Sequence, residues 1–180
     1  MTKLENDGGS VRVRQGAAVS TVKVIGRGTM RQSPAVFRHA SAALAGGASV
    51  RVDLSDCAYM DSTFLGTLLR LARTEPARTR AGAFAVLCPS AACRELMAQM
   101  GVEKAIPTDA DAGADAGEAT WTDLPLDEAA PDRAAAVQET VVHAHQHLAD
   151  TPSPGTRQFK DIAAKLAKAW DAQKGKGGNG

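Results

Sequence analysis

The hydrophobic pattern changes its period within residues 49–72, and this change constrains the fold more than any other feature of the chain. Val50, Val52 and Leu54 alternate with polar residues, which is the pattern of a strand with one buried face. Apolar residues then recur at the spacing of a helix, at Phe64, Leu65, Leu68, Leu69 and Leu71. The pattern predicts a buried strand, a short connection and a helix that begins near Asp61.

Three polar residues, Asp61, Ser62 and Thr63, stand at the start of this helix. The first backbone N–H groups of a helix lack partners, and side-chain oxygens there can accept their hydrogen bonds. A helix cap is therefore the simplest interpretation. One cap is enough, however, and we expect the hydroxyl groups at this position to be exposed. A phosphate on Ser62 would meet the positive end of the helix dipole beside Asp61, so the residues also allow a phosphorylation site.

The run DLSDCAYMDSTFLGTLLRL resembles the signature of the STAS domain, which anti-sigma factor antagonists and sulfate transporter tails share. In that signature a DLS-type strand leads to M-D-S-[ST]-G-L-G. The match covers residues 53–55, 60–63 and 65–66, and it departs at Phe64, where many antagonists have glycine. The order of predicted elements agrees over residues 11–108. The resemblance implies an α/β fold with a STAS-like mixed sheet of four to five strands and crossover helices.

The resemblance also implies a function. In this family the unphosphorylated domain binds an anti-sigma factor that is also an ATP-dependent serine kinase. The kinase phosphorylates the first hydroxyl after the aspartate, which corresponds to Ser62, with Thr63 as second choice, and a cognate phosphatase reverses the reaction. The implied partner-binding residues are Asp61, Ser62, Thr63 and Phe64, and the bulk of Phe64 would alter the fit of the partner. The alternative is a STAS scaffold subunit of a signalling assembly or of a transporter complex.

The segments around the motif predict a sheet with crossover helices. Valines near residues 11–13 and 19–24 indicate two strands of a hairpin, and a helix then runs from Ser33 and Pro34 to the glycines at 46–47. Residues 73–82 read as a loop, followed by a strand over 83–88 and a helix that ends at Gly101. Residues 102–106 would be a short last piece of the core. Parallel neighbours need such crossover connections, so a mixed sheet is expected.

The chain changes character after residue 108. Residues 109–132 contain eight acids and no Lys or Arg, so we predict an acidic linker over 109–131, with a short latch around Trp121 as an open possibility. Two amphipathic helices are expected within 132–172, and their apolar faces are Val137, Val141, Val142, Ala144 and Leu148, then Phe159, Ile162, Leu166 and Trp170. Similar helical extensions with an AH-x-x-L run, here 144–148, occur on some bacterial STAS proteins.

The faces of these two helices must be covered, because apolar stripes are costly to leave in water. They can dock on the domain, pair in a homo-oligomer or bind another protein. We expect residues 1–10 to be a flexible lead and residues 173–180 a disordered tail.

Composition excludes several classes of partner. The 21 Lys and Arg nearly balance the 20 Asp and Glu, and the net charge of +1 gives no reason to expect nucleic acid or an anionic membrane. No apolar run approaches the roughly 20 residues of a membrane helix, and the first residues lack the apolar core of a signal peptide. We therefore expect a cytoplasmic protein without membrane insertion. Cys57, Cys88 and Cys93 are odd in number and look like reduced structural cysteines.

The sequence offers little for catalysis or metal binding. His143 and His147 are four residues apart, but Ala144, His145 and Gln146 stand between them where a zinc-protease motif has its acid. Ser62 has no base evident in the sequence, so its phosphorylation would be the work of another enzyme. We expect no catalytic residue, no cofactor and no metal, and hence a binding protein rather than an enzyme.

Overall fold

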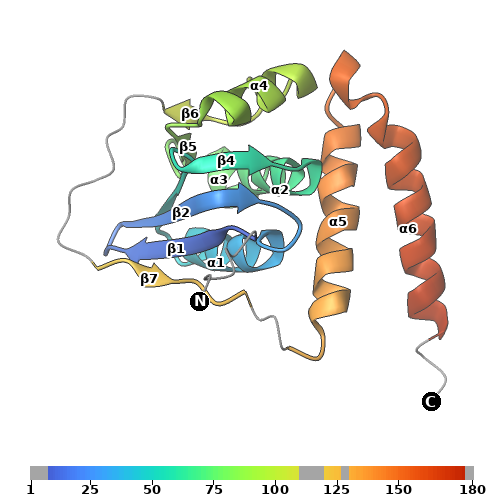
Figure 1. Cartoon of the computed structure of the whole chain (residues 1–180), viewed down its shortest axis with the longest axis horizontal. Coiled ribbons are helices and arrows are strands. Elements are labelled where there is room, and N and C mark those ends of the chain that lie inside the picture. The colour runs from blue at the N-terminus through green and yellow to red at the C-terminus, as the bar shows by residue number, and fades with distance from the viewer. Residues whose placement is uncertain (1–7, 110–119, 127–129, 177–180) are drawn as a thin grey trace, which may run out of the picture.

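The computed structural model describes residues 8–109, 120–126 and 130–176, and its elements alternate between strands and helices (Figure 1). The strands are β1 (Ser10–Gln15), β2 (Val19–Gly28), β3 (Ser49–Asp53), β4 (Cys57–Met60), β5 (Phe84–Leu87), β6 (Thr108–Asp109) and β7 (Thr122–Asp123). The helices are α1 (Ser33–Ala45), α2 (Ser62–Ala72), α3 (Glu75–Thr79), α4 (Ala91–Met100), α5 (Arg133–Ala149) and α6 (Phe159–Lys176), with a 3-10 turn, η1 (Pro154–Thr156), before α6.

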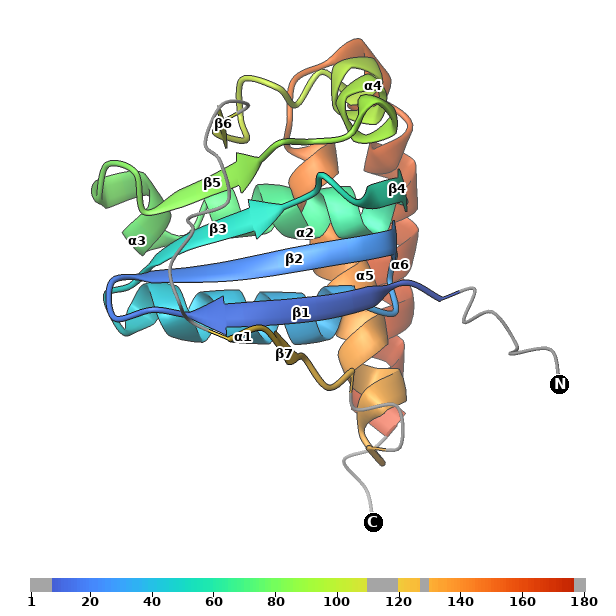
Figure 2. The same cartoon turned by 60° about the vertical axis from the view of Figure 1, so that its left-hand side comes forward.

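The sheet is mixed, with the strand order β6-β5-β3-β2-β1-β7 (Figure 2). Strand β1 pairs antiparallel with β2 as the predicted hairpin, whereas β2, β3, β5 and β6 are parallel. Strand β2 is ten residues long and changes partner along its length. Its first part pairs with β3, and Gly26 to Gly28 pair with β4 after a register shift between Gly26 and Arg27.

The core lies between the sheet and helices α1 and α2, which cover one face of it (Figure 2). Val22, Val50, Val52 and Val86 point to this face and are fully buried, as strand alternation requires. Helix α2 supplies the largest share of the helical side of the core, because Phe64, Leu65, Leu68, Leu69 and Leu71 are all buried. The change of period in the sequence thus marks the place where the chain passes from the sheet layer of the core to the helix layer.

The predicted fold class is confirmed, but the number of strands is larger than the expected four to five. Seven strands occur within the described residues, and two of them have only two residues each. Strand β4 lies in the segment that we expected to be a plain connection. Residues 73–82 contain the short helix α3 instead of only a loop, and residues 102–106 form turns that bury Val102 and Ile106 without a strand.

The C-terminal helical extension is also confirmed, and α5 and α6 form a helical hairpin beside the sheet domain. Helix α5 packs against α2, and α6 lies on the outer side of α5 (Figure 1). The face of α6 differs by one position from the expected stripe. Ala163 is buried in place of Ile162, which is 40% exposed. Both residues lie three or four positions from Phe159 and Leu166, so helical spacing alone does not distinguish them. Helix α6 continues to Lys176, beyond the end expected at 172.

The segment around Trp121 forms strand β7, which pairs antiparallel with β1. Arg14 lies over the Trp121 ring at 5.0 Å, and Arg12 pairs with Asp123 at 3.3 Å. Most of the expected flexible lead, the middle of the acidic linker and the end of the expected tail fall outside the described residues. None of the helices in the described ranges is both long and apolar enough to cross a membrane. Cys57, Cys88 and Cys93 form no disulfide within the described residues.

Candidate functional site

Asp61 fixes the start of α2 and joins it to the loop before α1. Its backbone is extended, and its Oδ1 accepts a hydrogen bond of 2.8 Å from the Phe64 N–H, as an N-cap should. Oδ2 accepts a second hydrogen bond of 3.0 Å from the Met30 N–H, and the Asp61 N–H donates to the Gly28 carbonyl. Both carboxylate oxygens therefore have backbone donors, and the helix start is held in one orientation.

Ser62 is the first residue of α2 and is half-buried. Of the four residues expected to bind a partner, it and Asp61 reach the surface, whereas Thr63 and Phe64 are buried. Phe64 is fully buried because its ring packs over Gly28 of β2, where an added Cβ would lie 2.9 Å from the ring. The expectation that Phe64 presents its ring to a partner is therefore wrong for this structure.

Two exposed apolar side chains flank Asp61 and were not singled out from the sequence. Tyr59 is 45% exposed on β4, with Arg27 over its ring at 4.3 Å, and Met30 is 48% exposed in the loop whose N–H binds Asp61. The one sequence signal for Tyr59 is its position two residues before Asp61. No sequence signal pointed to Met30, because the hydrogen bond between its loop and the start of α2 is a tertiary contact.

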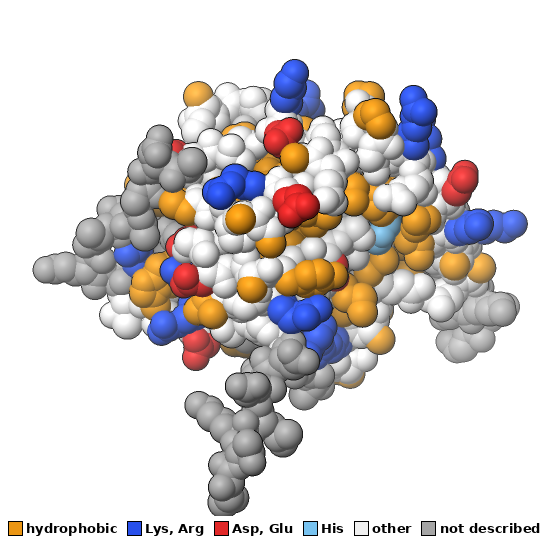
Figure 3. Space-filling model, turned by 45° about the horizontal axis from the view of Figure 1, so that its top comes forward, with side chains coloured by type: hydrophobic (Ala, Val, Ile, Leu, Met, Phe, Trp, Pro, Cys, Tyr) orange, Lys and Arg blue, Asp and Glu red, His pale blue; other side chains and the backbone are white. Residues whose placement is uncertain are grey.

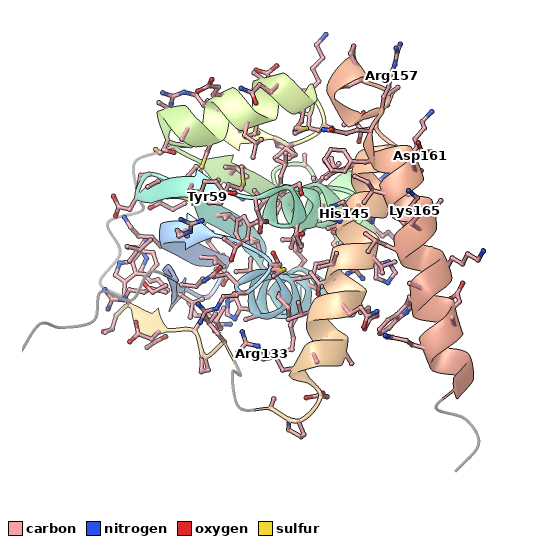
Figure 4. All side chains as sticks on the ribbon, turned by 45° about the vertical axis from the view of Figure 1, so that its right-hand side comes forward. Tyr59, Arg133, His145, Arg157, Asp161 and Lys165 are labelled. Carbon is pink, nitrogen blue, oxygen red and sulfur yellow. The ribbon has the colours of Figure 1, made fainter. Side chains whose placement is uncertain are left out.

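Helix α5 covers the other side of Ser62 through His145. The His145 Nε2 lies 3.5 Å from the Ser62 Oγ, and its Nδ1 lies 2.8 Å from the Val141 carbonyl oxygen. A backbone carbonyl can only accept, so Nδ1 carries the proton in the neutral ring and Nε2 is left as an acceptor. The Ser62 hydroxyl is thus the donor in this contact. In Figure 4, Tyr59 lies on β4 and His145 on α5, with α2 drawn between them.

The ring of His145 is held on its remaining sides. It is 8% exposed, and the ring of Phe159 from α6 lies 5.4 Å away, measured between ring centroids. On the face drawn in Figure 3, cationic and anionic side chains are interspersed, and hydrophobic side chains gather around one partly visible histidine. The burial of His145 and its contact with the Phe159 ring place it in the apolar seam between α5 and α6, although the sequence drew attention to its neighbours at 143 and 147.

Those two histidines face arginines at the C-terminal end of α2, Arg70 in its last turn and Arg73 directly after it. Arg73 donates to the His147 carbonyl at 2.8 Å and to the Thr151 Oγ1 at 2.7 Å, and Arg70 stacks over the Phe37 ring at 3.8 Å. Burial, assisted by the charges of Arg73 and Arg70, lowers the pKa of His147 to about 4. Burial and Arg70 also lower the pKa of His143, with Glu139 opposing the shift.

The histidines of α5 do not form a metal site with their surroundings. In the parts of the chain that the structure describes, no three His, Cys, Asp or Glu side chains come together as a group that could hold a metal ion. The Ser62 and His145 side chains resemble a nucleophile and base, but their 3.5 Å separation exceeds the roughly 2.6–3.2 Å typical of such pairs. We therefore interpret their contact as part of the packing between α2 and α5.

The match to a protein family agrees with this geometry. A family model described as "Mlab, STAS domain" matches residues 11–108, which is more than half of the 180 residues. The chain belongs to the STAS domain family. The matched region ends at β6, so β7, α5 and α6 lie outside the part of the chain that matches the STAS model. No curated protein sequence matches the chain significantly.

Solved structures similar to this STAS protein include three of anti-sigma factor antagonists or related regulators, each of which aligns with 57% of this chain. The anti-sigma factor antagonist SpoIIAA in its unphosphorylated form has 17% identity and a TM-score of 0.48, with 90% of that chain covered. An antagonist from Mycobacterium paratuberculosis has 24% identity and a TM-score of 0.49, with 86% covered. The Bacillus cell fate determinant SpoIIAA in its phosphorylated form has 16% identity and a TM-score of 0.46, with 93% covered. The family assignment itself rests on the STAS model.

Proposed function

We propose that this STAS protein is a phosphorylation-switched binding regulator, an anti-sigma factor antagonist that binds an anti-sigma factor with serine kinase activity while Ser62 is unphosphorylated. The observation that carries the proposal is the position of Ser62 as the first residue of α2, directly after the cap Asp61. The STAS signature at residues 60–66 supports the same residue as the acceptor. The phosphate would come from ATP bound to the partner, and a phosphatase would remove it.

The contact surface for the partner is centred on Asp61 and Ser62 and is flanked by Met30 and Tyr59. The two exposed apolar side chains supply area that can be removed from water on binding, and the half-buried polar pair supplies specificity. Thr63 and Phe64 act from inside the domain, where they fix the helix start that presents Ser62.

The switch works through charge and solvation and needs no refolding of the domain. The Ser62 Oγ attacks the γ-phosphorus of the ATP, its proton passes to a base of the kinase, and ADP leaves. The product carries nearly two negative charges beside the Asp61 carboxylate. The positive end of α2 stabilises this dianion in the free protein, whereas a bound partner would have to strip water from it. Every 1.4 kcal/mol of that penalty weakens binding about tenfold.

The experiment that tests the proposal compares proteins retained from the native host by full-length Ser62→Ala and Ser62→Asp variants. We expect a protein with a serine kinase ATP-binding domain to copurify with Ser62→Ala and to be depleted with Ser62→Asp. Mass spectrometry of the wild-type protein should find phosphate on Ser62. Phosphate found only outside residues 61–63 would contradict the proposal. Equal retention of a transporter ATPase or of a large assembly by both variants would also contradict it and would favour the scaffold function.

A further inference from the structure

The helical hairpin of α5 and α6 lies against Ser62, the residue that the proposed function most needs to be accessible. Helix α5 makes its most extensive contact with α2, and His145 lies directly against Ser62. These helices are outside the region that matches the STAS model, so the cover is an addition to the domain rather than part of it.

The contact between α2 and α5 is close enough to depend on a missing side chain. A Cβ added at Gly66 would lie 2.4 Å from the carbonyl oxygen of Ala144 and 2.7 Å from its Cβ. Ala144 is fully buried there. The two helices therefore meet backbone against backbone one turn after Ser62, and the space beside Ser62 is set by this contact.

The hairpin is attached at two further points beyond Gly66. Arg73, at the C-terminal end of α2, donates to the His147 carbonyl and to the Thr151 hydroxyl. The turn between the helices packs on the end of α4, where the Ser153 hydroxyl donates to the Met100 carbonyl at 2.6 Å. A Cβ at Gly155 would collide with the backbone of Gln99 in the same contact. These attachments are specific and together hold α5 along the full length of α2.

We propose that the α5–α6 hairpin is an intramolecular competitor for the Ser62 surface, so that a partner gains full access to Ser62 only when α5 leaves α2. The identity of the competing partner, a serine kinase that binds at Asp61 and Ser62, rests on the proposed function. The closed arrangement reduces partner affinity and the rate of Ser62 phosphorylation by the same factor, which is the fraction of molecules that are open.

Phosphorylation and docking of the hairpin also exclude one another. A phosphoryl group adds three oxygens to the Ser62 Oγ, where the gap to the His145 Nε2 is 3.5 Å. His145 cannot retreat easily, because Phe159 and the Val141 carbonyl hold its ring. Since coupling between two events is reciprocal, a hairpin that disfavours phosphate on Ser62 is itself released by that phosphate. The phosphorylated protein is therefore the open form.

The test uses full-length protein in which a thiol probe reports access to residue 62. Ser62→Cys is treated with a thiol reagent, and the rate is measured at residue 62 by peptide mass spectrometry, which separates it from Cys57, Cys88 and Cys93. Ala144→Lys places a cation in the buried contact with Gly66 of α2, and it changes no residue of the part that matches the STAS model. Ala135→Lys puts the same charge on an exposed position of the same helix and is the matched control.

We expect Ala144→Lys to raise the labelling rate at residue 62 about tenfold and Ala135→Lys to leave it unchanged, as a shift from mostly closed to mostly open requires. Equal labelling rates in Ser62→Cys alone and with either lysine substitution would show that α5 does not restrict access to residue 62. Equal increases for the two lysine substitutions would show the same. Hydrogen exchange of α2 amides checks that the domain stays folded in Ala144→Lys.

A second arm separates failure of the cover from failure of the proposed function. The lysine variants with Ser62 intact are phosphorylated by the kinase retained from the host, and Ala144→Lys should react about tenfold faster. If labelling differs between the variants but phosphorylation rates are equal, competition is overturned. If no variant is phosphorylated although labelling differs, the proposed function is wrong and the cover stands without that partner.

Discussion

The backbone of α5 crosses α2 at Gly66, where the carbonyl oxygen of Ala144 occupies the space that a Cβ would need. Gly66 is also the last glycine of the STAS signature in this sequence. The same residue thus belongs to the motif that presents Ser62 and to the contact that covers it. Gly66 lies one helical turn after Ser62, so the contact between α2 and the C-terminal extension is close to the residue that is phosphorylated in the proposed switch.

Gly66→Ala tests this contact directly. Alanine favours a helix over glycine by up to about 1 kcal/mol, but the added methyl group forces α5 away and overpacking costs about 1–3 kcal/mol. We expect faster hydrogen exchange over residues 136–149, with protection in α2 preserved. The control is Gly46→Ala, whose Cβ would meet only the carbonyls of its own helix. Unchanged exchange in α5 would show that the helices do not depend on the missing side chain.

Phe64→Ala tests the buried position that the structure gives to this ring. The ring is fully buried against Gly28, so its removal should destabilise the protein by about 3–5 kcal/mol through lost burial and a cavity. Urea unfolding measures the change. Ile162→Ala removes a side chain that is 40% exposed and should cost at most about 0.5 kcal/mol. A small loss for Phe64→Ala, together with a large loss of partner binding, would return Phe64 to the contact surface.

The histidines of α5 predict how stability depends on pH. Burial and the charges of Arg73 and Arg70 lower the pKa of His147 to about 4 in the folded protein, whereas a histidine in the unfolded chain titrates near its ordinary value of 6.5. Between these values the unfolded state binds more protons than the folded state. The contribution of neutral His147 to the free energy of unfolding is therefore fully present above pH 6.5 and is lost as the pH falls toward 4. The charged and titratable neighbours in this region are Arg70, Arg73, Asp150 and His143.

The measurement for this prediction is the urea midpoint of the wild type and of His147→Asn at pH 7.5 and pH 5. We expect the wild type to lose more stability than the variant between the two values. The variant should keep some dependence on pH, because burial also lowers the pKa values of His39 and His143. Equal losses in the two proteins would show that His147 titrates normally and is not confined between α5 and α2.

Charge, rather than shape, should control the switch at Ser62. Since the Phe64 ring is buried, it adds no bulk beside the Ser62 hydroxyl, and the exposed apolar side chains of this surface are those of Met30 and Tyr59. Ser62→Asp should weaken partner binding more than the similarly sized Ser62→Asn, because the new carboxylate lies beside that of Asp61. The difference should shrink as salt rises, since exposed charges are screened within about 10 Å at 0.1 M salt. Equal losses that do not respond to salt, measured by calorimetry, would indicate a steric mechanism.

Much of the sheet domain was predictable because its signals are local. The change of period at Asp61 gave β3 and α2, alternating valines gave the β1–β2 hairpin, and Ser90 and Gly101 marked the ends of α4. Strand β4 was missed because its buried residues, Cys57 and Met60, are three apart and do not alternate. Its pairing with the far end of β2 is a long-range contact that no local pattern records.

The site was predictable in part. Asp61 as the helix cap followed from its residue type and position, and the structure confirms it. The burial of Phe64 and the cover over Ser62 did not follow, because both depend on contacts with distant residues, Gly28 and His145. The apolar faces of α5 and α6 indicated that something must cover them, but the sequence left the domain, a second copy and another protein equally open. In the structure, α5 is covered by α2 on one side and by α6 on the other.

The most direct test of the central claim is the affinity of the copurifying serine kinase for two forms of the full-length protein, unphosphorylated and phosphorylated only on Ser62, titrated in a calorimeter under the same conditions. The account predicts that the unphosphorylated form binds and that phosphate on Ser62 weakens binding by about a hundredfold or more, which corresponds to about 2.7 kcal/mol. Equal affinities of the two forms, or tighter binding of the phosphorylated form, would contradict it.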